Sequence, residues 1–451
     1  MSQAVSRRDL LKWATTGAGA AVVGGGAWLI GREDRGTGRS ASSAKPGAEA
    51  RSDAPDNSSA ASGPGSTAPA PTPPAAPLTA HPDLSRRLLV VVEMGGGNDG
   101  LSMTVPYGMG GYYDLRPGTA IAAENVLSID DELGYVKNLA NVHRRGAAIV
   151  QGVGSFTPDG SHFAMSDRWW KGDPDGTGAY DAGFFGRLAD AVGDPAAAAV
   201  AVATRGGNHP ALVSRKVGTV GLSSLSAARY LTGAKPDNPN LYAFQKGLAA
   251  FAQGGGDGFG GQLRDVDARA ITFAESVSGL VDENGLRPNY PDNNFTRGLS
   301  LAMSLFLVDE GVRIVYVPMD GDFDTHDDHV ARHAEMMTRL DEGLGVFMDD
   351  LAANDLADRV LMMTTSEFGR RAGDNGSSGL DHGTASNALL LGPVNPGRYG
   401  ELPSFTDLTD DNFQTTVGMD QYYATVAQNW FGVPASDVLN GNVAPLEGLI
   451  S

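Results

Sequence analysis

The chain after residue 87 alternates short, continuously apolar runs with longer segments of helical periodicity. Runs of this kind are typical of strands that are covered on both faces of a sheet. The predicted strands are Leu88–Glu93, Ala147–Val150, Ala199–Ala203, Ile314–Val317, Val360–Thr365 and Ala388–Leu391. Between them, Thr296–Gly311 has helical spacing, and apolar residues recur on one helix face from His329 to Leu351. The alternation predicts one α/β domain over residues 87–451, with a doubly wound, mostly parallel sheet.

The N-terminal residues predict an export signal within residues 1–31. "SRRDLLKW" (Ser6–Trp13) resembles a twin-arginine motif, and a weakly apolar, Gly/Ala-rich stretch follows it to Ile30. The other interpretation is a chance arginine pair before an apolar run. The twin-arginine translocase would then be a partner, and the protein would be extracellular, periplasmic or attached to the cell envelope. Ala48-Glu49-Ala50 is an acceptable cleavage site, whereas an uncleaved signal would tether the protein to the membrane.

Residues 32–86 have the composition of a disordered linker. They are rich in Ser, Ala, Pro, Gly and Thr, as in "TAPAPTPPAAP". So little apolar surface cannot offset the entropy lost on ordering. The "QGGGDGFGG" segment at residues 253–261 is interpreted as a flexible loop rather than a domain boundary.

Charge and cysteine content exclude several kinds of function. The net charge is −19, and a surface this acidic repels phosphate backbones, which argues against nucleic-acid binding. The chain has no cysteine, so it has neither disulfides nor thiolate chemistry. Any metal ion must therefore be held by histidine, carboxylates and other oxygen ligands.

A glycine-rich turn follows the first predicted strand of the domain. In "VVVEMGGGNDGL" (Val90–Leu101) the glycines spell G-x-G-x-x-G, the dinucleotide-binding pattern. That pattern requires a helix directly after the glycines, whereas "LSMTVPYGMGGYYDLRP" follows here and its proline and glycines prevent a regular one. An oxidoreductase is therefore only a remote alternative. The turn is expected to expose Asn98 and Asp99 at the sheet edge where ligands bind.

Polar segments also lie at the ends of other predicted strands. "MDGDFDTHDDH" follows Ile314–Val317, "SEFGRR" follows Val360–Thr365, and "GLDHGT" shortly precedes Ala388–Leu391. A further segment, "GSHFAMSDRWWKG", contains Ser161 and His162. Because strand ends in such a sheet meet at one edge, these side chains are candidates for a common site.

The residue types in these segments predict a metal site. Three or four Asp and His ligands around a divalent ion, such as zinc, manganese or calcium, form a hydrolytic centre. The candidate ligands are Asp99, Asp324, His326, Glu367 and His382. Glu367 could instead act as a base, and Arg370 could hold an anionic substrate oxygen.

The alternative interpretation is structural, and both remain open at this point. The Asp residues would cap helices and form turns, and the histidines would be satisfied by backbone groups. His329 and His333, four residues apart on a predicted helix, are expected on a solvated face rather than around a metal.

The combined motifs resemble the bacterial family called domain of unknown function 1501. They span about Leu88 to Phe431, and they are "GGNDGL", "YYDLRP", "SHFAMSDRWW", "FDTHDDH", "TSEFGRR", "GLDHGTASNALLLG" and "QYYATVAQNWFG". The resemblance extends to the alkaline phosphatase and sulfatase superfamily. It implies a three-layer α/β/α sandwich, alkaline-phosphatase-like, with metals at the carboxyl ends of the strands of a mostly parallel central sheet.

The resemblance also implies roles for particular residues. Asp99 matches the Asp after the first strand, His382 matches a late His, and Asp324 (or Asp322) with His326 matches an Asp and a His of a later loop. Two departures stand out. Glu367-Phe368 occupies the place of an Asp-His pair, and the Ser or Thr nucleophile has no clear counterpart. Ser161 is the candidate nucleophile, although it lies far along the chain.

The sequence thus predicts an exported, metal-dependent hydrolase of a small or polymeric phosphate or sulfate ester. His162 or Glu367 would serve as acid and base, and Arg370 would orient the anion. The alternative is a superfamily member without catalysis that acts as a cell-envelope binding or assembly protein, because fold alone does not decide function.

Overall fold

A ten-stranded sheet forms the centre of the fold. The computed structural model describes residues 27–30, 78–205, 207, 209–222 and 286–451. The strand order is β1-β8-β7-β9-β2-β10-β11-β6-β12, and β13 also pairs with β6. These strands are β1 (Ala27–Ile30), β2 (Leu88–Glu93), β6 (Ala148–Gly154), β7 (Ala201–Ala203), β8 (Thr219–Leu222), β9 (Ile314–Pro318), β10 (Val360–Thr365), β11 (Ser386–Leu391), β12 (Gly397–Tyr399) and β13 (Val417–Gly418).

The sheet is mostly parallel, as the sequence predicts. β2 pairs in parallel with β9 and β10, and β7 pairs in parallel with β8 and β9. β11 pairs antiparallel with both of its neighbours, β10 and β6. Each apolar run that the sequence marks as a strand lies within or overlaps a strand of this sheet.

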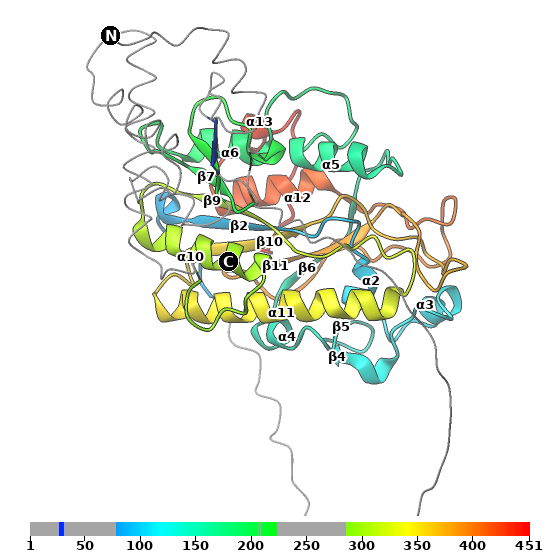
Figure 1. Ribbon diagram of the computed structural model, residues 1–451. Helices are drawn as coiled ribbons and strands as arrows, with labels where there is room; N and C mark the ends of the chain where they lie inside the picture. The colour runs from blue at the N-terminus through cyan, green and yellow to red at the C-terminus, as the bar shows by residue number, and fades with distance from the viewer. Residues whose placement is uncertain (1–26, 31–77, 206, 208, 223–285) are drawn as a thin grey trace, which may run out of the picture. The chain divides into compact units, whose positions relative to one another are not determined.

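Helices cover both faces of the sheet and make a three-layer α/β/α arrangement (Figure 1). One face carries α4 (Ala140–Arg145), α10 (Asn294–Val308) and α11 (His329–Ala353), and the other carries α5 (His162–Lys171), α6 (Phe184–Val192), α12 (Met419–Thr425) and α13 (Ala435–Val438). Successive residues of a strand point to opposite faces. In β2, Leu88, Val90 and Val92 accordingly pack into the core beneath α10 and α11, whereas Leu89 and Val91 pack into the core beneath α6 and α12.

Shorter elements surround these layers. A small antiparallel sheet has the order β3-β5-β4. The remaining elements are α2 (Gly100–Met103), β3 (Thr104–Val105), α3 (Gly110–Leu115), β4 (Val126–Ser128), β5 (Gly134–Val136), the 3₁₀ helices η1 (Leu84–Arg86), η2 (Ala123–Asn125) and η3 (Pro210–Leu212), and the π-helical turn η5 (Val426–Trp430).

The predicted leader and linker fall mostly outside the described residues. Within the predicted signal, Ala27–Ile30 forms β1, which pairs in parallel with β8. Residues 1–26 and 31–77 and the segment at 253–261 are not described, so the signal, the linker and the domain boundaries stay predictions. In the described part of the chain, no helix combines the length and the apolar character that crossing a membrane requires.

The strand pairing brings the polar segments to one edge of the sheet. Glu93, the last residue of β2, pairs with Pro318 at the end of β9 and with Thr365 at the end of β10. Because β11 runs antiparallel to β10 and β6, it begins at this same edge, where Ser386 pairs with Val153 of β6. The loops after β2, β6, β9 and β10 and the loop before β11 therefore start or end side by side.

Candidate metal centre

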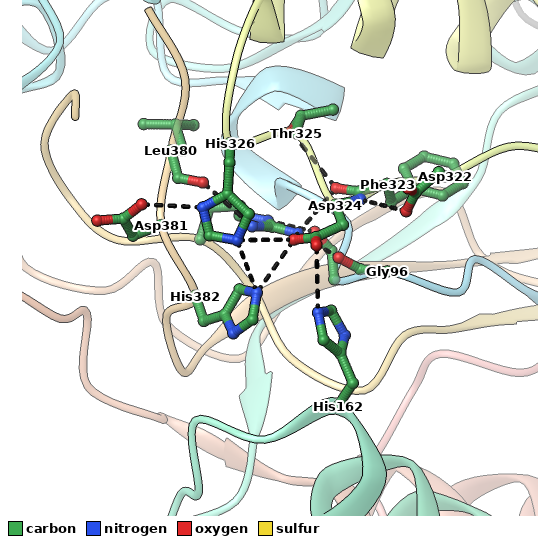
Figure 2. Close-up of polar contacts among 12 residues, drawn as sticks. Gly96, His162, Asp322, Phe323, Asp324, Thr325, His326, Leu380, Asp381 and His382 are labelled. Atoms are coloured by element: carbon green, nitrogen blue, oxygen red, sulfur yellow. Dashed lines mark hydrogen bonds and ion pairs between the residues drawn. The ribbon is translucent and has the colours of Figure 1, made fainter. Parts of the chain in front are cut away.

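Three imidazole rings converge on the carboxylate of Asp324 (Figure 2). The Nε2 atoms of His326 and His382 each lie 3.0 Å from Asp324 Oδ1, and His162 Nε2 lies 3.5 Å from Asp324 Oδ2. Among the described residues, His162, Asp324 and His382 form a group whose ligand atoms all lie within 4.8 Å of one another. The four side chains come from the loop after β9, the loop before β11 and the first residue of α5.

The glycine run after β2 allows the turn that carries Asp324 to pack closely. Gly96 has a φ of +111°, and a Cβ atom there would lie 2.6 Å from the backbone nitrogen of Asp324. A Cβ atom at Gly97, with a φ of +83°, would lie 2.4 Å from the ring of Phe368. Only glycine fits both the backbone conformation and the space. The run therefore serves close packing beneath the site, and the helix that follows, α2, has a single turn.

The other ring nitrogen of each histidine is held by a hydrogen-bond acceptor. His162 Nδ1 lies 2.8 Å from Glu367 Oε1, His326 Nδ1 lies 2.9 Å from Asp381 Oδ1, and His382 Nδ1 lies 2.9 Å from the carbonyl oxygen of Gly160. Carboxylates and carbonyls only accept, so each Nδ1 carries a proton and donates it. This arrangement turns all three Nε2 atoms toward Asp324, and it is the usual outer shell of metal-binding histidines.

The contact between His326 and His382 fits a cation between them. Their Nε2 atoms are 2.9 Å apart. With both Nδ1 atoms protonated, two neutral rings would direct lone pairs at each other. Either an additional proton or a metal ion must relieve this repulsion. A metal ion would also satisfy His162, whose Nε2 faces the same carboxylate.

The spacing of the donor atoms also fits a small divalent ion. Nitrogen and oxygen ligands bind zinc at about 2.0–2.1 Å, so neighbouring ligands of a tetrahedral site lie roughly 3.3 Å apart. The contacts from Asp324 to the three histidines and the contact between His326 and His382 span 2.9 to 3.5 Å, and the ligand atoms of His162, Asp324 and His382 lie within 4.8 Å of one another. Three imidazoles and one carboxylate thus match both the number and the chemistry of a zinc-type ligand set.

The charges around the cluster keep Asp324 ionised. Its partial burial alone would raise the pKa of Asp324, but the hydrogen bond and charge of Arg370 are the largest opposing effects and hold this pKa below its usual range. The hydrogen bond to Glu367 raises the pKa of His162. The ring of Phe368 lies 4.8 Å from the ring of His162 and 4.7 Å from that of His382, and so forms an apolar wall beside the cluster.

Glu367 and Arg370 contact residues of the cluster but are not themselves placed as ligands. Glu367 Oε1 accepts hydrogen bonds from Gly96 N and His162 Nδ1, so its position suits orientation of His162 rather than metal ligation. Arg370 is 1% exposed and donates to Asp324 Oδ1 and to the carbonyl groups of Gly96, Gly97, Phe323 and Leu380. The expectation that Arg370 orients a substrate anion does not fit, because backbone acceptors bind its guanidinium group in the interior.

Asp99 lies in a different set of contacts from the predicted one. Both of its oxygens accept hydrogen bonds from Arg116, at 2.5 and 3.0 Å, and both side chains are at most 2% exposed. Asp99 also caps α2 by accepting from Ser102 N. The structure therefore contradicts the expectation that Asp99 joins Asp324 and the histidines, since its contacts are with Arg116, Ser102 and His329.

Two further expectations concern residues at helix starts. Ser161 is the N-cap of α5, and its side chain accepts from Ala164 N, so the structure shows a capping role for the candidate nucleophile. His329 and His333 are 0% and 2% exposed, so the prediction of a solvated face is wrong. Both rings pack on the inner face of α11 together with Met336, Met337 and Leu340.

Sequence reasoning missed the residues that orient the cluster. Asp381 holds His326, and Asn375 Nδ2 donates both to Asp381 Oδ1 and to the carbonyl oxygen of His326. The adjacency of Asp381 and His382 in "GLDHGT" was an available indication of a shared site. The sequence contains no such indication for the carbonyl group of Gly160, because every residue has a backbone carbonyl.

Comparisons with known structures find distant likenesses. The lipoteichoic acid synthase LtaP from Listeria monocytogenes is 9% identical with a TM-score of 0.35, covering 81% of this chain and 77% of that one. The PsFucS1 sulfatase from Pseudoalteromonas sp. is 14% identical with a TM-score of 0.35, covering 80% and 70%. Alkaline phosphatase from the Antarctic bacterium TAB5 is 12% identical with a TM-score of 0.32, covering 68% and 92%. Scores and identities this low carry no argument about the chemistry of this chain.

A family comparison gives a firmer result. No curated protein matches the chain. The family model described as "Protein of unknown function (DUF1501)" matches residues 145–430. The matched range includes His162, Asp324, His326 and His382 and covers more than half of the 451 residues. The resemblance seen in the sequence motifs is therefore confirmed, and the chain belongs to the DUF1501 family.

Proposed function

We propose that this protein is a hydrolase of anionic esters, phosphate or sulfate, that depends on one divalent metal ion. The ion would be held by His162, Asp324, His326 and His382. The observation that carries the proposal is the convergence of three imidazole Nε2 atoms on the carboxylate of Asp324, with each Nδ1 atom held by a hydrogen-bond acceptor.

The donor set favours a transition metal over calcium. Calcium takes six to eight oxygen ligands, whereas imidazole nitrogen suits zinc and related ions. Zinc or manganese is therefore the expected ion. When bound, such an ion supplies Lewis-acid stabilisation of charge on an ester oxygen.

Neighbouring residues would orient the ligands of this centre and offset the charge of Asp324. Glu367 accepts a hydrogen bond from Nδ1–H of His162, and Asp381 accepts one from Nδ1–H of His326. Both Nε2 atoms would therefore present lone pairs to the ion. Arg370 holds Asp324 Oδ1 at 2.8 Å and offsets its charge. Asp324 is 29% exposed and His326 43%, so the cluster is open to a substrate from solvent.

The proposal includes export through the twin-arginine route. Arg7 and Arg8 in the "SRRDLLKW" segment support it, together with the apolar stretch that follows. This route carries folded proteins, so the ion would bind before export. The mature protein would act outside the cytoplasm, free or tethered by its signal.

The test is ester hydrolysis by purified protein loaded with zinc or manganese. 4-Nitrophenyl phosphate and 4-nitrophenyl sulfate would be compared before and after chelation, with His382→Ala as the inactive variant. His143→Ala is the matched control, because His143 lies on α4 and its ring contacts the carbonyl of Ser128 instead of the cluster. We expect turnover that chelation and His382→Ala abolish and that His143→Ala retains.

Bound metal without turnover of any phosphate or sulfate ester would contradict the hydrolase proposal. That result would favour the second class of function, a binding or assembly protein of the cell envelope that has kept the ion as a structural element.

A further inference from the structure

A buried polar chain lies directly beneath the turn that carries Asp324 and His326. His329, the first residue of α11, has no exposed surface. Its Nδ1 atom lies 2.7 Å from Thr325 Oγ1, and its Nε2 atom lies 3.0 Å from Ser102 Oγ and 3.4 Å from Asp99 Oδ2. Histidine is not often buried this completely, and here every ring nitrogen has a partner.

Thr325 connects this chain to the metal centre. It lies between Asp324 and His326 in the sequence and is fully buried, whereas its two neighbours are 29% and 43% exposed. The turn therefore directs Thr325 inward and the two candidate ligands outward. Thr325 is also held through its backbone, because its carbonyl accepts from Leu380 N in the loop that carries His382.

The far end of the chain is fixed by a charge pair. Asp99 accepts two hydrogen bonds from Arg116 and caps α2 through Ser102 N. Arg116 in turn donates to the carbonyl groups of Ala372 and Arg371. His329 thus bridges a rigid group after β2 and the metal-binding turn after β9.

We propose that His329 is a positioning residue of the metal centre, which fixes the orientation of Asp324 and His326 through the hydroxyl group of Thr325. The inference rests on the metal centre of the proposed function and extends it to residues that touch no ion. Loss of an outer-shell partner typically weakens metal affinity by about 10–100-fold. A similar loss is expected when the contact between His329 and Thr325 is removed.

His333 provides a matched control for general effects of burial. It lies one turn further along α11, is 2% exposed, and contacts Asn98 Oδ1 at 3.0 Å. Its polar contact does not involve Thr325. Its ring packs 5.1 Å from the ring of His329 and 6.1 Å from that of Phe323. A substitution at His333 therefore disturbs the packing beneath the turn while the hydrogen bond between His329 and Thr325 is retained, so it reports the effect of packing alone.

The experiment measures zinc affinity of the full chain by competition with a chromophoric chelator, together with the visible absorption of the cobalt-loaded protein. Thr325→Val removes the hydroxyl at nearly constant shape, and Thr325→Ser restores it. We expect Thr325→Val to weaken zinc binding at least about 10-fold and to change the cobalt spectrum, with Thr325→Ser within about threefold of wild type. His333→Asn removes ring packing but not the hydroxyl contact, so it should lower stability and keep zinc affinity within about threefold of wild type.

The outcomes separate this inference from the proposed function. Wild-type affinity and spectrum in Thr325→Val would overturn the positioning role alone. A wild-type protein that binds no ion would overturn the metal centre and the positioning role together. If Thr325→Val does not fold, His329→Gln is the substitute variant, with the same expected and contradicting results. The amide of glutamine takes the place of the Nε2 atom beside Ser102 and leaves the hydroxyl of Thr325 without its partner at this position.

Discussion

Replacement of Asp99 by asparagine separates a structural role for this residue from a role as metal ligand. The carboxylate accepts hydrogen bonds from Arg116 at 2.5 and 3.0 Å, and both side chains are at most 2% exposed. Burial alone would raise the pKa of Asp99, yet Arg116 and His329 lower it well below its usual range. Asparagine keeps the shape and removes the charge.

The size of the effect follows from the burial of the pair. Removing one partner of a buried ion pair costs about 3–5 kcal/mol, because the other charge stays buried without compensation. Asp99→Asn should therefore lose about 3–5 kcal/mol of unfolding free energy. Because Asp99 contacts Arg116 rather than the histidine cluster, the variant should still load metal to the wild-type stoichiometry when the ion is in excess.

The assay combines urea denaturation with metal analysis of the folded protein. A second variant, Asp99→Asn with Arg116→Met, removes both charges and should recover a large part of the loss. Loss of metal from Asp99→Asn together with a stability change below about 1 kcal/mol would refute the reasoning and return Asp99 to the ligand set.

Three further predictions test other parts of the structure. Burial and the neighbouring His329 lower the pKa of His333 to about 3, against about 6.5 when unfolded, so only the unfolded state gains this proton as the pH falls. Between pH 8 and pH 5 the free energy of unfolding should therefore fall by about 2 kcal/mol because of His333. In urea titrations at the two pH values, this part of the decrease should be absent from His333→Asn. Glu367→Ala frees the Nδ1 atom of His162 and should weaken zinc binding about 10–100-fold in chelator competition, with Glu367→Gln weakening it less. Ser161→Ala removes the cap of α5 and should cost about 1 kcal/mol on denaturation, with metal content unchanged; ester turnover lost completely would instead identify Ser161 as the nucleophile.

The sheet and the edge that carries the candidate site were predictable from local patterns. The continuous apolar runs of β2 and β10 mark buried parallel strands, and parallel strands place their carboxyl ends together. This reasoning was enough to bring Asp324, His326 and His382 to one candidate site. His162 was identified as an acid or base, and the geometry adds it to the candidate ligands.

Partners that lie on other elements were not predictable. Asp99 has the residue type and the position of a metal ligand, but Arg116, 17 residues further along the chain, donates hydrogen bonds to its carboxylate. Arg370 was expected to face a substrate, yet carbonyl groups from separate loops bind it in the interior. These acceptors belong to the backbone, so no residue type in the sequence indicates them.

The burial of His329 and His333 did leave a trace in the sequence. Both continue the spacing of the core-facing stripe of α11, which runs on through Met336, Met337 and Leu340. The interpretation as a solvated face used only the four-residue spacing, which places both histidines on one face without saying which face it is. The periodicity was the better guide, because a whole helix face is buried or exposed together.

The most direct test of the account is the metal content of protein purified without chelators or metal-binding tags, measured by plasma mass spectrometry. Wild type would be compared with Asp324→Ala and His382→Ala, with His143→Ala as the control. The account predicts about one equivalent of a divalent transition metal in wild type and control, and none in the two cluster variants. Folded wild-type protein that retains no ion after incubation with zinc or manganese would contradict it.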